Sequence, residues 1–175
     1  MSSAFEEQLT AYAHRHRSDG ILLDTNVLLL LLFANFQPSM IGGKRLEKYA
    51  LEDAALLAGY VSRFNRILTT AHVLAETSNL AAQVLTGKWK AEFFSQLFPL
   101  FCTDTEEALH PCELKASDVD AAIFVRLGLT DASLVATLGV NRLLLTDDLD
   151  LHLAAMAKGA PSINFTHMRE AAGLL

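Results

Sequence analysis

Short apolar runs alternate with longer stretches of helical spacing along this chain. Ile21 to Leu23 is fully apolar and follows a turn at Asp19-Gly20, as expected for a buried parallel strand. Similar runs predict further strands at Arg66 to Thr70, at Arg142 to Thr146 and at Ser162 to Phe165.

Apolar spacing and capping residues predict helices between these strands. Ser3 to Glu6 is a capping box that opens a helix reaching about Arg17. The other predicted helices are Val27 to Ala34, Lys44 to Phe64, Ala71 to about Leu100 with a break near Gly87, a segment capped by Ser117 to Asp120 that ends near Gly128, Thr130 to Gly139, Asp148 to Lys158, and Thr166 to Ala172. Pro38 to Gly43 is expected to be a loop, and Thr103 to Lys115 a loop or a weak strand. Strands that alternate with helices in this way predict an α/β fold with a largely parallel sheet.

Composition points to one globular domain. The chain has 175 residues, of which 51% are apolar and 19% charged, so it is neither a disordered nor a fibrous protein. Two complete domains would be cramped at this length. We therefore expect a single domain over residues 1–175, in which residues 1–20 form a helical extension.

The sequence also predicts a cytoplasmic protein with no membrane partner. The longest apolar run, Val27 to Ala34, is too short to cross a bilayer, and the first twenty residues lack the apolar stretch of a signal peptide. Cys102 and Cys112 are expected to be reduced thiols, because a chain with a large core needs no disulfide.

Acidic residues interrupt the apolar pattern at positions where a hydrophobic core does not explain them. Asp24 follows the first strand, Asp148 follows the strand ending at Thr146, and Asp131 begins a helix close by in sequence. Ligands of open α/β sheets bind outside the carboxyl ends of the strands, so these acids are expected to share one edge. Glu76, on an otherwise apolar helix face, is a candidate to join them.

Carboxylates crowded together repel one another unless a cation neutralises them. Oxygen-only ligands favour Mg²⁺ or Mn²⁺ over zinc. A cation held in this way can activate water and stabilise charge on a phosphate that is being cleaved. The net charge of −6 argues against RNA binding through a broad basic face, but a metal site contributes to that negative charge.

These acids and their neighbours resemble the four motifs of PIN-domain nucleases, in the order of that family. The residues that carry the resemblance are Asp24-Thr25-Asn26 after a strand, Glu76 on a helix, Asp131-Ala132 opening a helix, and Thr146-Asp147-Asp148-Leu149-Asp150 after a strand. The similarity runs from about Ile21 to Phe165. It implies a PIN-like, three-layer α/β fold and a metal-dependent endoribonuclease, in many cases the toxin of a toxin–antitoxin pair.

By position, the resemblance makes Asp24, Glu76, Asp131 and Asp148 both catalytic residues and metal ligands. Asp150 would be an outer ligand, and Asn26 and Thr146 would orient carboxylates or substrate. The Thr-x-Asp spacing of the family selects Asp148 within its acidic run, so Asp147 is expected to be solvated. The expected partners are RNA, an antitoxin protein and a second copy of the chain.

Simpler interpretations remain open beside these. Each aspartate can be a helix cap, which is compatible with metal binding, and Glu76 can be a solvated helix residue. The apolar run Leu28 to Phe33 is first a core helix and second an interface with a second copy or an antitoxin. His72 is expected to be an ordinary helix residue.

Two other functions compete with a nuclease. A catalytically inactive PIN-like module would bind RNA or protein without cleaving. A phosphatase of the haloacid-dehalogenase type also begins from an aspartate after a strand, but it needs a second aspartate two residues on, where this chain has Asn26.

Overall fold

A computed structural model describes residues 3–102, 109–111, 118–139 and 141–175. Five short strands form one sheet in which every neighbouring pair is parallel, in the order β3-β2-β1-β4-β5. The strands are β1 Ile21–Leu23, β2 Ile67–Thr69, β3 Leu109–Pro111, β4 Leu143–Thr146 and β5 Ser162–Asn164. The predicted α/β class with a parallel sheet is therefore confirmed.

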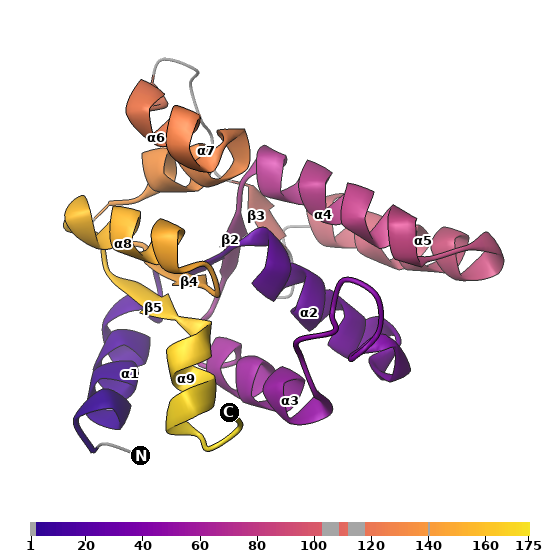
Figure 1. The fold of residues 1–175 in the computed structure, drawn as a ribbon, viewed down its shortest axis with the longest axis horizontal. Helices are drawn as coiled ribbons and strands as arrows, with labels where there is room; N and C mark the ends of the chain where they lie inside the picture. The colour runs from indigo at the N-terminus through magenta and orange to yellow at the C-terminus, as the bar shows by residue number, and fades with distance from the viewer. Residues whose placement is uncertain (1–2, 103–108, 112–117, 140) are drawn as a thin grey trace.

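Helices cover both faces of the sheet in a three-layer arrangement. They are α1 Ser3–His16, α2 Thr25–Phe36, α3 Leu51–Val61, α4 Ala71–Val84, α5 Gly87–Cys102, α6 Ala121–Leu127, α7 Leu129–Thr137, α8 Leu149–Ala157 and α9 Phe165–Ala171, with a 3-10 turn η1 at Pro38–Met40. Figure 1 shows α1, α3 and α9 on one side of the sheet and α4, α6 and α7 on the other. No helix in the described part of the chain is long and apolar enough to cross a membrane.

The core lies around the central strands and α2. All residues of β1 and β4 are buried, as the fully apolar runs predict for strands covered on both faces. The α2 residues from Leu28 to Phe33 are each at most 9% exposed, because α2 packs between α3 and α4. The core interpretation of this run is confirmed, and its alternative as an intermolecular interface is wrong.

The N-terminal helix is part of this packing. Phe5, Leu9 and Tyr12 pack against the core, and the hydroxyl of Tyr60 in α3 donates a hydrogen bond to the Leu9 carbonyl at 3.1 Å. The turn that follows needs Gly20, whose φ is +94° and whose added Cβ would lie 2.9 Å from the Arg66 carbonyl oxygen.

Two predicted boundaries are wrong. The helix expected from Lys44 begins only at Leu51, because the preceding residues form an irregular loop in which Arg45 has φ +74°. We call residues 44–50 the site loop; burial of its Leu46 and Tyr49 produced the spacing that resembled a helix. The cap of α9 is Asn164 rather than Thr166, since the Asn164 side chain accepts the backbone N–H groups of Thr166 and His167. Of the stretch 103–115, only β3 lies within the described residues.

Candidate active site

The sheet reverses its direction of winding between β1 and β4. From β1 the chain proceeds to β2 and β3 on one side, whereas β4 is followed by β5 on the other. Such a switch point leaves a crevice outside the carboxyl ends of the two central strands, which is where ligands bind in open α/β folds. Asp24 follows β1 and Asp147 follows β4, and the Asp24 N–H donates to the Leu145 carbonyl at 3.3 Å.

Asp24 is buried, with 3% of its surface exposed, and both of its oxygens accept hydrogen bonds. Oδ1 accepts the backbone N–H of Val27 at 2.8 Å and thereby caps α2. Oδ2 accepts the Thr146 hydroxyl and the Asp147 N–H, the latter at 3.0 Å. Burial and then the charge of Asp147 raise the pKa of Asp24 to about 7, although these hydrogen bonds act in the opposite direction. The capping interpretation is thus correct, and the same carboxylate also faces the switch point.

Asp147 is the main departure from the sequence-based site. Its side chain is only 2% exposed, so the expectation that it is solvated is wrong. Oδ2 receives the Tyr49 hydroxyl and forms an ion pair with the Lys48 ammonium, and Oδ1 accepts the Asn26 amide at 3.3 Å. The Thr-x-Asp spacing selects Asp148 alone, but the chain leaves β4 at Thr146 and turns toward α8, and in this turn the Asp147 side chain is buried.

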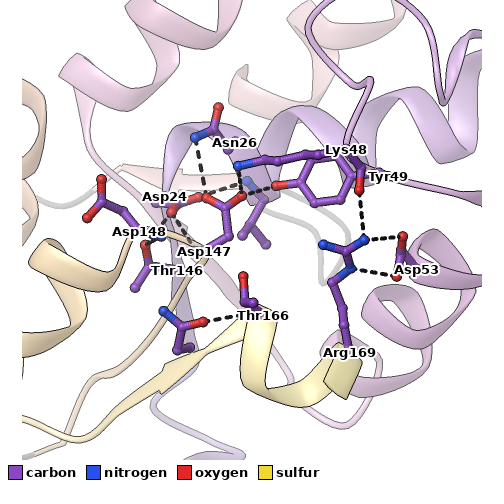
Figure 2. Close-up of polar contacts among 12 residues, drawn as sticks. Asp24, Asn26, Lys48, Tyr49, Asp53, Thr146, Asp147, Asp148, Thr166 and Arg169 are labelled. Carbon is purple, nitrogen blue, oxygen red and sulfur yellow. Dashed lines mark hydrogen bonds and ion pairs between the residues drawn. The ribbon is translucent and has the colours of Figure 1, made fainter. Parts of the chain in front are cut away.

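Asp148 lies on the opposite side of this turn and is exposed. Its Oδ1 accepts the Leu151 N–H at 2.9 Å and caps α8, while its own N–H donates to the Thr146 hydroxyl oxygen at 2.9 Å. Figure 2 shows the Asp148 carboxylate pointing away from that of Asp147. Asp150 is exposed in the first turn of α8.

Asp131 of α7 and Glu76 of α4 lie near Asp148. Asp131 is half-buried, and burial followed by the charges of Asp148 and Glu76 raises its pKa to about 6. Glu76 is exposed, but its Oε2 accepts the Thr25 hydroxyl at 3.0 Å, which ties it to the residue after Asp24. Glu76 is therefore an exposed helix residue, as the simpler interpretation expects, and it is also hydrogen-bonded beside Asp24.

The acids thus fall into two groups. We call Asp24 and Asp147 the inner pair, and Asp131, Asp148 and Glu76 the outer group. The inner pair has a fixed cation in Lys48. The outer group has none among the described residues: Lys48 pairs with Asp147, and Arg169 pairs with Asp53.

A buried ion pair holds the site loop in place (Figure 2). Arg169 donates from Nε to Asp53 Oδ1 at 2.7 Å and from Nη2 to Oδ2 at 3.0 Å. The same Nη2 donates to the Lys48 carbonyl at 2.7 Å, and the guanidinium lies 5.4 Å from the centre of the Tyr49 ring. Sequence reasoning missed Lys48 and Tyr49 because it placed both in a helix.

The donor set suits a hard cation, although the side chains are not gathered into a coordination shell. Within the described residues, no three acidic, histidine or cysteine side chains form a group that could hold a metal ion as they stand. Burial, and after it the charges of Asp148 and Glu76, raise the pKa of Asp131, and a divalent cation would offset the repulsion among these three acids. Oxygen donors of this kind fit Mg²⁺ or Mn²⁺. His72 belongs to no such group, and one of its ring nitrogens is buried without a hydrogen-bond partner.

Comparison with protein-family models, curated proteins and solved structures finds no match to this chain. The resemblance to PIN-domain nucleases therefore rests on the sequence motifs alone.

Proposed function

We propose that this protein is a metal-dependent endoribonuclease of the PIN-domain type. One observation carries the proposal: carboxylates from four separate segments converge beside the switch point, and two of them, Asp24 and Asp131, have strongly raised pKa values. Burying a carboxylate beside other negative charges destabilises the fold. A functional role is therefore the better explanation for the positions of Asp24 and Asp131. The order of the four motifs along the sequence supports the same assignment.

Each group of acids has its own role in this proposal. Asp131, Asp148 and Glu76 would hold Mg²⁺ or Mn²⁺, with Asp150 close by in the first turn of α8. The cation would activate water and neutralise charge on the phosphodiester. Asp24 lies at the carboxyl end of β1 and is oriented by Thr146, while Asn26 orients Asp147. Fixed orientation of these carboxylates lowers the reorganisation needed when substrate binds.

Single-stranded RNA is the proposed substrate, and the toxin role with a cognate antitoxin follows only from the resemblance. The negative net charge makes a bound cation important for substrate binding, because most phosphate contacts would otherwise face carboxylates. Lys48 is the basic side chain that the described structure places against the acids.

The test is cleavage of an end-labelled single-stranded RNA with Mn²⁺ and with EDTA. The proposal predicts internal cuts that require the cation. An inactive PIN-like module would instead shift the RNA in a binding assay and leave its length unchanged with Mn²⁺ present. That outcome would contradict the enzymatic role.

A further inference from the structure

Lys48 supplies the positive charge nearest to the inner pair. The side chains of Asp24 and Asp147 are almost completely buried, and the Asp147 backbone N–H donates directly to Asp24. Two buried carboxylates this close together cannot both stay ionised without a compensating cation. In the structure that cation is the Lys48 ammonium, which pairs with Asp147 Oδ2.

The hydrogen bonds of the inner pair leave little room for another ligand. Asp24 uses Oδ1 for Val27 and Oδ2 for Thr146 and Asp147. Both oxygens of Asp147 also have donors, from Asn26 on one side and from Tyr49 and Lys48 on the other. A divalent ion at Asp147 would have to displace Lys48.

The position of Lys48 is built into the fold. Its carbonyl oxygen accepts the Arg169 guanidinium at 2.7 Å, and Arg169 is itself fixed by the buried carboxylate of Asp53. The Lys48 side chain is 54% exposed, so its ammonium reaches Asp147 from the solvent. Backbone anchoring of this kind lowers the entropy lost when the side chain pairs with Asp147.

The outer group differs in this respect. No lysine or arginine of the described segments pairs with Asp131, Asp148 or Glu76. A site with two cations needs positive charge on both sides of the scissile phosphate, and a lysine ammonium can supply one of the two.

We propose that Lys48 is the resident cation of the inner pair and takes the place of a second metal ion. The divalent cation then binds at the outer group alone. This inference rests on the proposed function for the role of that divalent cation, but the pairing of Lys48 with the inner pair does not depend on RNA cleavage. Lys48 also gives the crevice a positive group beside which a phosphate can lie.

The experiment counts Mn²⁺ ions bound by the metal-stripped full chain, using the electron paramagnetic resonance signal of free Mn²⁺. Lys48→Met removes the ammonium and keeps the length of the side chain, whereas Lys48→Arg keeps a cation. Lys44→Met is the matched control, because Lys44 is an exposed residue of the same loop. Thermal melts in EDTA on the same four proteins show whether each is folded.

We expect Lys48→Met to bind one more Mn²⁺ per chain than the wild type and to melt at a lower temperature in EDTA. Lys48→Arg and Lys44→Met should keep the wild-type stoichiometry. Adding Asp147→Asn to Lys48→Met should abolish the extra site and restore part of the lost stability. If Lys48→Met is too unstable to titrate, the same comparison with Lys48→Gln decides the question.

Equal stoichiometry in the wild type and in the folded Lys48→Met or Lys48→Gln variant would overturn the inference. The number of Mn²⁺ ions bound by the wild type tests the proposed function instead. A wild type that binds no Mn²⁺ contradicts the proposed metal-dependent function. A variant that binds one Mn²⁺ while the wild type binds none would still support the role of Lys48. The two failures are therefore distinguishable.

Discussion

Arg169 of α9 and Asp53 of α3 form a two-pronged ion pair in the protein interior, with N–O distances of 2.7 and 3.0 Å. Only 7% of Arg169 and 1% of Asp53 are exposed. The same guanidinium also bonds to the carbonyl of Lys48, so the pair joins two helices and the site loop. It therefore connects the stability of the fold to the position of Lys48 and Tyr49 beside Asp147.

Arg169→Met should destabilise the protein by about 3–5 kcal/mol, because it leaves Asp53 buried without a partner. The measurement is the free energy of unfolding in urea at neutral pH. Asp53→Leu combined with Arg169→Met should recover part of the loss, since no uncompensated charge then remains. A single variant as stable as the wild type would show that the ion pair contributes nothing to the fold.

The acidic run at 147–150 should respond to alanine substitution in a different order from the one that sequence spacing suggests. Asp147→Ala removes the acceptor of Lys48, Tyr49 and Asn26, so it should lower RNA cleavage by on the order of 10²-fold or more. Asp148→Ala should have an effect of the same order, because its charge acts on Asp131. Asp150→Ala should be mild, since Asp148 and Glu76, and not Asp150, are the charges that act on Asp131.

Cleavage rates at saturating Mn²⁺ compare these three variants. A mild effect of Asp147→Ala with a severe effect of Asp148→Ala would support the assignment from the Thr-x-Asp spacing, in which Asp148 belongs to the site and Asp147 does not. Circular dichroism spectra and melts are needed beside the rates, because Asp148 also caps α8.

Divalent cations should raise the melting temperature of the protein. An ion that binds only the folded state stabilises it by mass action, and it also relieves repulsion within the outer group. Melts with EDTA and with millimolar Mn²⁺ should differ, and Asp148→Ala should reduce the difference. If the melting temperature with Mn²⁺ equals that with EDTA in both the wild type and Asp148→Ala, the result argues against a shared carboxylate site.

Stability without metal should increase as the pH falls from 8 toward 5. The folded-state pKa values of Asp24 and Asp131 are about 7 and about 6, above the ordinary value of 3.8 for aspartate. At pH 8 both groups are ionised in the folded and unfolded states, and the buried charges destabilise the fold. As the pH falls through 7 and then 6, the folded state takes up protons that the unfolded state does not, so folding is favoured.

Melts in EDTA across this pH range measure the effect. Asp24→Asn should flatten the dependence because it removes the more strongly shifted group, and Asp19→Asn, at an exposed position, should leave it unchanged. A wild type that is less stable at pH 5.5 than at pH 8 in EDTA would contradict the raised pKa values.

The local sequence pattern predicts the features that depend on residues close together in the chain, such as buried strands, helix breaks and helix caps. Apolar runs identified β1 and β4 as buried strands, and the aspartate after β1 lies at the switch point because parallel strands end at the same edge. The break between α4 and α5 was likewise visible near Gly87. Asp24 as a helix cap follows from the same local chemistry.

What the sequence did not reveal depends on contacts between distant segments. Asp53 and Arg169 are 116 residues apart, and neither has a local signal that identifies its partner. The site loop was predicted as helix because Leu46 and Tyr49 have helical spacing, although each is buried separately. The burial of Asp147 likewise involves distant residues, because its carboxylate contacts Lys48 and Tyr49 of the site loop.

We propose that the carboxylates beside the switch point cleave RNA with the help of a divalent cation. The measurement is the rate of Mn²⁺-dependent cleavage of single-stranded RNA by the wild type and by Asp24→Asn, with Asp19→Asn as the matched control. The amide keeps an acceptor for Val27, but its NH2 group faces the Asp147 N–H in place of an acceptor, so thermal melts must show that the variant is folded. The folded variant lacks the negative charge and should lose cleavage by on the order of 10²-fold or more, while Asp19→Asn stays at the wild-type rate. Wild-type cleavage by a folded Asp24→Asn, or no cleavage by the wild type with Mn²⁺, would contradict the claim.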